Sequence, residues 1–179
     1  MEKRQKMRIL IAEDETIIRL DLRYMLERAG FEVCAETGDG EEAVRLARET
    51  EAEAAVLDVR MPGMTGIEAA RRILAERPIP IVMLTAYADP GTVMEAVRAG
   101  VFAYVVKPFR EQDLLPALET AFARHREWLD GRRDLGHAPV GSSGALEVVV
   151  GDSRWPLRIE RGPDGSLDVS LLSSEEESR

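Results

Sequence analysis

Acidic, hydroxyl and basic side chains stand directly after short apolar segments of the sequence. These side chains belong to Glu13, Asp14, Asp58, Thr85 and Lys107. Carboxylates that share one site raise each other's pKa, and a divalent cation relieves that conflict. An all-oxygen set of ligands favours a hard ion such as Mg²⁺. An aspartate beside Mg²⁺ and a lysine can act as a nucleophile toward phosphorus, because the two cations stabilise charge on the transferring phosphoryl group. The pattern therefore predicts Mg²⁺-dependent phosphoryl chemistry at Asp58.

This chemistry requires a fold that brings the ends of separate strands together. Five apolar segments alternate with five helix-like patterns, and the segments are 7–12, 31–37, 54–57, 80–84 and 102–106. The alternation predicts an α/β domain with a parallel sheet covered by helices on both faces. In such a sheet the carboxyl ends of the strands share one edge, where ligands bind.

Helix boundaries are marked by residues that cap helices. Asp39, Thr65 and Asp89 each precede a helical pattern and are predicted N-caps, Thr65 with the Thr-x-x-Glu spacing of a capping box. Pro116 lies near the start of the last helical pattern. Because a proline fits best in the first turn, we expect that helix to span 113–129 with Asp113 as its N-cap.

The overall composition limits the classes of partner. The 179 residues carry a net charge of −9, which disfavours a partner bound through its phosphate backbone. No apolar run approaches the length of a membrane span, so no membrane partner is expected. Cys34 is the single cysteine of the sequence, which fits a reducing compartment. We expect a cytoplasmic protein.

The composition changes after residue 129. Residues 130–144 are rich in Gly, Pro and Ser and are interpreted as a linker, 145–173 as a small β-rich appendage, and 174–179 as a frayed tail. Residues 131–179 hold six Arg and no Lys against nine acids, so nucleic-acid binding through this acidic tail is not expected. So short a segment cannot bury a core of its own. We expect it to dock on the first domain, to pair with a second copy or to extend a partner's sheet; a tail from a shifted reading frame is left open.

Four segments together resemble the signature segments of CheY-like receiver domains: 11–15 (IAEDE), 57–66 (LDVRMPGMTG), 83–86 (MLTA) and 104–109 (YVVKPF). The resemblance covers residues 7–129. It implies a doubly wound, five-stranded parallel sheet of the flavodoxin/CheY-like type with strand order 2-1-3-4-5, here followed by a C-terminal β-ribbon. It also implies a response regulator of a two-component phosphorelay. Such a protein takes a phosphoryl group from a sensor histidine kinase and is a switch, with no enzymatic activity beyond its own phosphorylation and dephosphorylation.

The resemblance also assigns roles to residues of the acidic site. Asp58 would be the phosphoacceptor. Asp14 would bind Mg²⁺ directly, and Glu13 would assist through water. The backbone carbonyl of Arg60 would be a further ligand, and the side chain of Arg60, with that of Tyr87, would tune the lifetime of the phosphoryl group.

Four further residues would respond to phosphorylation or shape the site. Lys107 would pair with the phosphoryl oxygens, and Thr85 would form a hydrogen bond with the same group. Movement of Thr85 would let Tyr104 swing inward. The bond between Lys107 and Pro108 would be cis, as in relatives.

Other functions stay open beside the receiver. Residues 107–128 resemble receivers that precede an RNA-binding ANTAR antiterminator module. The alternative is thus a relative of such antiterminators that has lost or altered its output module. An Asp-based phosphatase is disfavoured, because haloacid-dehalogenase phosphatases place a second Asp two residues after the nucleophile, where this chain has Arg60. Homodimerisation is also left open.

Overall fold

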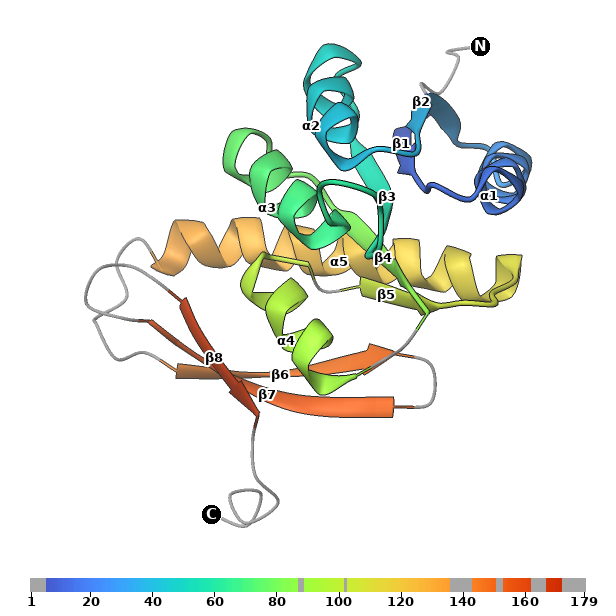
Figure 1. The fold of residues 1–179 in the computed structure, drawn as a ribbon. Helices are drawn as coiled ribbons and strands as arrows, with labels where there is room; N and C mark the ends of the chain where they lie inside the picture. Colours follow the sequence, from blue (N-terminus) through green and yellow to red (C-terminus); the bar gives the residue numbers. More distant parts are fainter. Residues whose placement is uncertain are drawn as a thin grey trace.

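A parallel sheet flanked by helices forms the larger part of the molecule (Figure 1). The computed structural model describes the backbone of residues 6–86, 89–101, 103–135, 143–150, 153–161 and 167–171, and the side chains as far as Arg126 apart from Pro90. Tyr87 and the tail at 174–179 lie outside the described residues.

The five strands of the main sheet all run in parallel, in the order β2-β1-β3-β4-β5. They are β1 (Arg8–Ala12), β2 (Glu32–Thr37), β3 (Ala54–Asp58), β4 (Ile81–Thr85) and β5 (Ala103–Val106). The predicted fold class and strand order are confirmed. Strands β1, β3 and β4 are almost wholly buried, which is why their sequences are apolar throughout rather than alternating.

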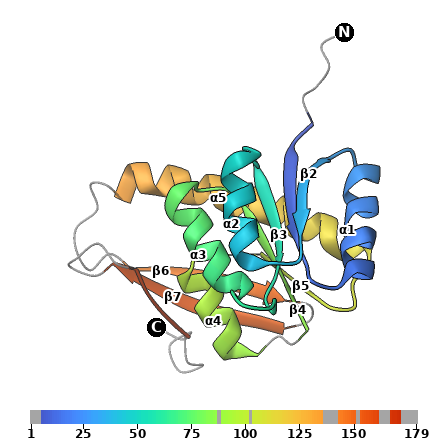
Figure 2. The ribbon, with the colours of Figure 1, turned by 45° about the horizontal axis from the view of Figure 1, so that its top comes forward.

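Two layers of helices cover the sheet (Figure 2). The helices are α1 (Thr16–Arg28), α2 (Gly40–Glu49), α3 (Gly66–Glu76), α4 (Pro90–Arg98) and α5 (Glu111–Leu135). Alternate side chains of each strand enter different cores, because successive residues of a strand point to opposite faces. Leu10 and Leu57 pack with α2, α3 and α4, whereas Ile9 and Val56 pack with α1 and α5.

The predicted N-caps of three helices are confirmed. The side chain of Asp39 accepts a hydrogen bond from the backbone N–H of Glu42 at 2.9 Å, which starts α2. Thr65 and Asp89 accept in the same way at the starts of α3 and α4. These bonds satisfy backbone donors that have no partner within the helix. They fix where the loops that follow β2, β3 and β4 end.

The last helix differs from its predicted bounds at both ends. It begins at Glu111, and the carboxylate of Asp113 reaches back to the backbone N–H of Arg110 at 2.8 Å. Asp113 therefore lies inside the first turn and is not the N-cap, and Pro116 lies inside the helix. The helix continues to Leu135, so it includes the first six residues of the segment interpreted as a linker.

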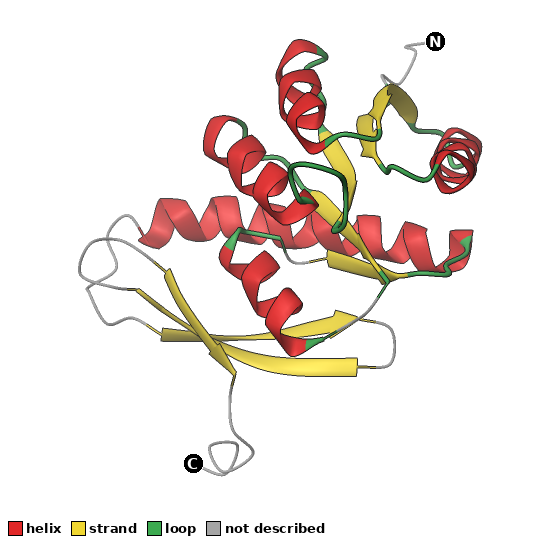
Figure 3. Ribbon diagram, in the orientation of Figure 1, coloured by secondary structure: helices red, strands yellow, loops and turns green. Residues whose placement is uncertain are grey.

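A second sheet follows α5 (Figure 3). Its antiparallel strands are β6 (Ser143–Val150), β7 (Ser153–Arg161) and β8 (Leu167–Leu171), in the order β6-β7-β8. Strand β6 lies beside β5 and strand β8 beside α4. Of the three arrangements expected for the tail, docking on the first domain is the one seen here.

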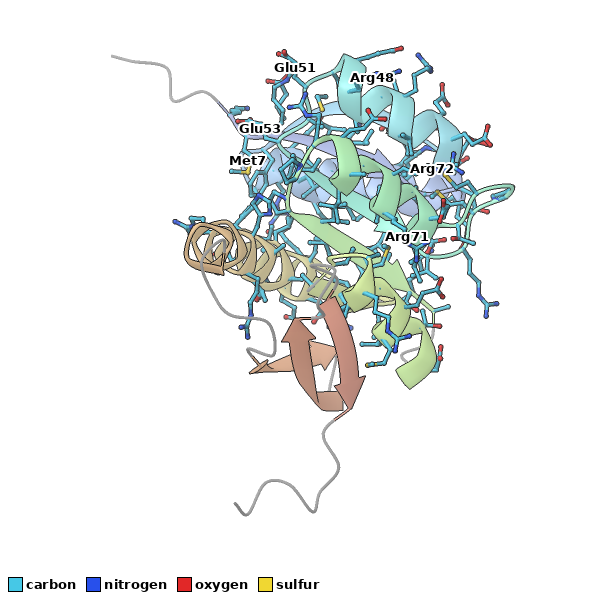
Figure 4. The ribbon with its side chains drawn as sticks, turned by 90° about the vertical axis from the view of Figure 1, so that its left-hand side faces the viewer. Met7, Arg48, Glu51, Glu53, Arg71 and Arg72 are labelled. Carbon is cyan, nitrogen blue, oxygen red and sulfur yellow. The ribbon has the colours of Figure 1, made fainter. Side chains whose placement is uncertain are left out.

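Charged side chains cover the helices on the side of α2 and α3 (Figure 4). Arg71 of α3 lies 2.6 Å from Glu68 and 3.9 Å from Glu95 of α4. Exposed ion pairs of this kind stabilise a fold by less than about 1 kcal/mol each. Within the described part of the chain, no helix combines the length and apolar character that a membrane crossing needs.

Candidate functional site

The carboxyl ends of β1, β3, β4 and β5 meet at one edge of the sheet. The strand order makes β3 a direct neighbour of both β1 and β4, and β5 a neighbour of β4. Asp58 is the last residue of β3, and Glu13 and Asp14 follow β1. Lys107 follows β5, and its backbone N–H donates to the carbonyl oxygen of Thr85 at 2.8 Å. Residues far apart in the chain therefore come together because parallel strands end together.

Three carboxylates form a cluster at this edge. Oxygen atoms of Glu13, Asp14 and Asp58 all lie within 4.8 Å of one another. Glu13 is fully buried, Asp58 is 4% exposed, and Asp14 is exposed to solvent. The cluster thus has two carboxylates inside the protein and one at its mouth. Solvent can reach the site on the side of Asp14.

The ammonium group of Lys107 lies among these acids. Its Nζ is 2.7 Å from Oε2 of Glu13, 3.1 Å from Oδ1 of Asp58 and 3.9 Å from Oε1 of Glu15. The lysine side chain is only 13% exposed, so water screens these interactions weakly. One cation therefore bridges the two buried carboxylates.

The charges of the site are incompletely balanced. Burial raises the pKa of Glu13, and the negative charge of Asp58 adds to this rise although Lys107 opposes it. Burial likewise raises the pKa of Asp58, with Lys107 opposing the rise and Asp14 adding to it. The pKa of Lys107 is also raised: burial would lower it, but hydrogen bonds and charge from Glu13 and Asp58 outweigh that effect.

The donor set fits a second, hard cation. Three carboxylates face one ammonium group, and carboxylate oxygens are the ligands that Mg²⁺ prefers. The raised pKa values of Glu13 and Asp58 indicate that Lys107 alone does not stabilise both carboxylates fully. Arg60 is two residues beyond Asp58, and its side chain is exposed.

Thr85 and Tyr104 lie on neighbouring strands beside the cluster. Thr85 ends β4 and is 4% exposed. The ring of Tyr104 is 6% exposed, and its hydroxyl donates to the carbonyl oxygens of Val101 at 2.8 Å and of Val93 at 3.4 Å. Burial raises the pKa of Tyr104 well above its usual range. In this structure Tyr104 therefore points inward, toward α4.

One backbone feature of the site was expected from the resemblance, and another was not anticipated. A β-carbon at Gly66 would overlap the carbonyl oxygen of Asp58, so glycine lets the start of α3 pack against the end of β3. The Lys107–Pro108 peptide bond is cis, as the resemblance implied. Gly66 belongs to the recognised segment 57–66. Its close contact with Asp58 depends on how α3 packs against β3, which no local sequence pattern predicts.

Arg19 is a second residue at the site that sequence reasoning missed. Its Nη1 donates to the carbonyl oxygen of Glu13, and the same atom is 3.4 Å from the carbonyl oxygen of Asp14. Arg19 is the fourth residue of α1 and is half-buried. Its spacing of five residues after Asp14 was the one available signal, and such a spacing is not specific.

Known proteins share this arrangement of segments. A family model described as the response regulator receiver domain matches residues 9–119. The transcriptional regulatory protein PdtaR of Mycobacterium tuberculosis (strain H37Rv) is 49% identical over 120 residues, which are 67% of this chain and 58% of PdtaR. The chemotaxis protein CheY of Pseudomonas aeruginosa is 38% identical over 121 residues, 66% of this chain and 98% of CheY.

A solved structure extends the similarity to three dimensions. The signal receiver domain of a modulated diguanylate cyclase from Desulfovibrio desulfuricans G20 is similar with a TM-score of 0.64 at 30% identity. The match covers 69% of this chain and 99% of that domain. The similarity thus spans a whole receiver domain, whereas the chain spans less than two thirds of PdtaR.

Proposed function

Because this chain belongs to the response regulator receiver domain family, we propose that it is the phosphoaccepting switch of a two-component phosphorelay, with Asp58 as the acceptor. The observation that carries this proposal is the buried carboxylate of Asp58 beside the ammonium group of Lys107 and the carboxylates of Glu13 and Asp14. A sensor histidine kinase in the cytoplasm is the proposed donor.

The transfer forms one bond and breaks another. An oxygen of the Asp58 carboxylate attacks the phosphorus atom, and the bond from phosphorus to the donor's imidazole nitrogen breaks. The electron pair of that bond leaves with the nitrogen. Lys107, already 3.1 Å from Asp58, is placed to pair with a phosphoryl oxygen. When bound, Mg²⁺ supplies positive charge that stabilises the phosphoryl oxygens.

Four groups are the proposed holders of Mg²⁺. Asp14 and Asp58 contribute carboxylate oxygens, Glu13 acts through water, and Arg60 contributes its backbone carbonyl. The support is the oxygen-rich cluster with incompletely balanced charge, which suits this ion. The cis Lys107–Pro108 bond immediately follows the residue whose ammonium group bridges the cluster.

The switch couples Asp58 to the α4–β5 side of the domain. Thr85, at the end of β4, would form a hydrogen bond with the phosphoryl group, and Tyr104 would respond to its movement. The support is their position: Thr85 pairs in register with Val106, while Tyr104 of β5 contacts the carbonyl oxygens of Val93 and Val101 around α4. Because β6 lies beside β5 and β8 beside α4, the C-terminal sheet contacts both elements that this change would involve.

Incubation with a small-molecule phosphodonor and Mg²⁺ tests the proposal. Intact-mass measurement should reveal one added phosphoryl group per chain, which Asp58→Asn abolishes and the exposed control Asp21→Asn retains. Rapid, Asp58-dependent release of many equivalents of phosphate, with no labelled chain accumulating, would instead mean a phosphatase. Absence of labelling at saturating donor and Mg²⁺ would refute the switch.

Regulation of transcription is a second candidate function. The observation that favours it is the 49% identity to the transcriptional regulatory protein PdtaR. The alternative read from the sequence, an RNA-binding antiterminator relative with an altered output module, belongs to this class. Filter binding of the phosphorylated full chain to RNA and DNA at low salt tests it, and retention no greater than that of Asp58→Asn would count against it. Sedimentation of the same samples tests for a homodimer.

A further inference from the structure

We infer that Arg19 is a positioning residue that holds the β1–α1 loop in the conformation that binds Mg²⁺. This inference rests on the proposed function, because it concerns the same acidic site. The segment from Glu13 to Glu15 is irregular backbone between β1 and α1, and it carries two of the three clustered carboxylates. The conformation of this loop therefore decides where those carboxylates point.

The interactions that hold the loop act mainly on Glu13, whose carboxylate lies 2.7 Å from Nζ of Lys107. The backbone N–H of Glu13 donates to the carbonyl oxygen of Thr37 at 2.9 Å, which extends the pairing of β1 with β2. The backbone N–H of Glu15 donates to Oε1 of Glu13 at 3.1 Å. Glu15 is the N-cap of α1 and forms no side-chain capping bond there. The side chain of Asp14 is exposed, so burial does not fix the direction of its carboxylate.

Arg19 adds a tether on the other side of this loop. Its Nη1 donates to the carbonyl oxygen of Glu13 and lies 3.4 Å from that of Asp14, and its Nη2 lies 3.4 Å from Oγ1 of Thr16. The planar guanidinium group thus spans the carbonyl groups on both sides of the Cα of Asp14. Nη1 alone reaches both carbonyl groups while Nη2 reaches Thr16, and a lysine ammonium group, which has a single nitrogen, cannot make both sets of contacts in this geometry.

Gly38 makes room for this contact. A β-carbon there would lie 3.2 Å from Cα of Asp14 and 3.4 Å from Nη1 of Arg19. The backbone of the β2–α2 loop therefore packs against the same two residues from outside. Arg19 is enclosed between that loop and the carbonyl groups that it binds, which limits the orientations open to it.

Orientation and charge act on Mg²⁺ affinity in opposite directions. A positive charge near the cluster repels a second cation. A fixed loop favours binding, because partners that orient ligands are worth about 10-fold or more in metal affinity. The proposed positioning role requires that the second effect exceed the first, so the sign of the change on substitution decides between them.

The test compares Arg19→Gln and Arg19→Lys in the full chain. Titration calorimetry measures the dissociation constant for Mg²⁺, and urea unfolding without Mg²⁺ measures the stability of each variant. We expect Arg19→Gln to weaken Mg²⁺ binding about 10-fold and Arg19→Lys to weaken it by a smaller factor. Arg23→Gln is the matched control, one turn further along α1, where the arginine pairs with Glu36 at 2.8 Å; it should leave the dissociation constant unchanged.

Each other outcome overturns the inference. Tighter Mg²⁺ binding in Arg19→Gln, with Arg19→Lys like the wild type, would mean that charge alone matters. An unchanged dissociation constant together with lower stability would mean a purely structural role.

Amide hydrogen exchange in the Mg²⁺-free protein gives a readout that does not depend on the metal. Faster exchange at Asp14 and Glu15 in Arg19→Gln is expected, and unchanged exchange would count against the inference. A wild-type chain that fails to bind Mg²⁺ would refute the proposed function instead, while this exchange measurement would still test the tether.

Discussion

Asp58→Asn should stabilise the Mg²⁺-free protein at neutral pH, although it removes a charge that contacts Lys107. At an effective dielectric constant of about 20, unit charges 3.1 Å apart attract by about 5 kcal/mol, and like charges 4.8 Å apart repel by about 3 kcal/mol. Asp58 has one such attraction, to Lys107, and two repulsions of at least this size before screening, from Glu13 and Asp14, because all three carboxylates lie within 4.8 Å of one another. Solvent weakens the repulsion from the exposed Asp14.

Attraction and repulsion therefore nearly cancel, and the cost of burying the Asp58 carboxylate remains. An asparagine keeps the shape and an acceptor oxygen for Lys107 but needs no charge to be buried. We expect the free energy of unfolding to rise by about 1–2 kcal/mol, which corresponds to about 3 °C in melting temperature for each kcal/mol in a protein of this size. Saturating Mg²⁺ should reduce the difference, because the wild type gains more from binding the ion.

The effect should depend on pH with a defined sign. Burial raises the pKa of Asp58 and of Glu13. A carboxyl group whose pKa is higher in the folded state stabilises the fold below its unfolded pKa, and this contribution is lost as the pH rises through its folded pKa. The wild type should therefore lose more stability than Asp58→Asn between acidic and neutral pH, and the two should converge at low pH.

Urea unfolding at a series of pH values, without Mg²⁺, measures this difference. The slope of the free energy against urea should be the same for both proteins, so that a shift in midpoint reports stability alone. Asp21→Asn, an exposed change on α1, is the matched control and should shift the midpoint little at any pH. An Asp58→Asn protein less stable than the wild type at neutral pH would refute the electrostatic reasoning.

Three further substitutions test separate parts of the site. Lys107→Gln should lower the rate of phosphoryl labelling at least 10-fold, measured by intact mass, because a group that pairs with the transferring phosphoryl oxygens is lost. Gly66→Ala should destabilise the fold by about 2–3 kcal/mol in urea unfolding, because its β-carbon overlaps the carbonyl oxygen of Asp58. Tyr104→Phe should cost about 1 kcal/mol through the lost bond to Val101, with labelling unchanged.

Each of these substitutions has its own control. Lys107→Gln is informative only if the circular dichroism spectrum stays native, and a native variant labelled at the wild-type rate would exclude a role for the ammonium group. Gly91 is exposed near the start of α4, and a β-carbon there would meet one carboxylate oxygen of Asp89 at 3.2 Å and no backbone atom. A cost of Gly91→Ala equal to that of Gly66→Ala would therefore contradict the packing explanation. For Tyr104→Phe, a slower labelling rate would show that its hydroxyl affects the chemistry directly.

The fold could be predicted because its signals are local. Alternation of apolar strands with capped helices fixed the sheet type, and the caps at Asp39, Thr65 and Asp89 are formed as expected. The predicted start of α5 at Asp113 was wrong. The carboxylate of Asp113 accepts a hydrogen bond from inside the first turn, and Pro116 is tolerated further along the helix. The end of α5 was missed because a Gly-containing segment was interpreted as a linker.

The candidate site could be predicted as a set of side chains but not as a geometry. The residues at strand ends are visible in the sequence once a parallel sheet is expected, and the structure brings Glu13, Asp14, Asp58 and Lys107 together. The tether from Arg19 and the close approach of Gly66 depend on how a helix packs against a strand end, which no local pattern encodes.

Reductive trapping of the labelled residue tests the central claim most directly. Borohydride cleaves an aspartyl phosphate and converts that side chain to homoserine, which peptide mass mapping then locates. The account predicts homoserine at position 58 alone, only when donor and Mg²⁺ were both present. Homoserine at Asp14 or at another acid, or an unmodified Asp58 in a chain that carries the phosphoryl group, would contradict it.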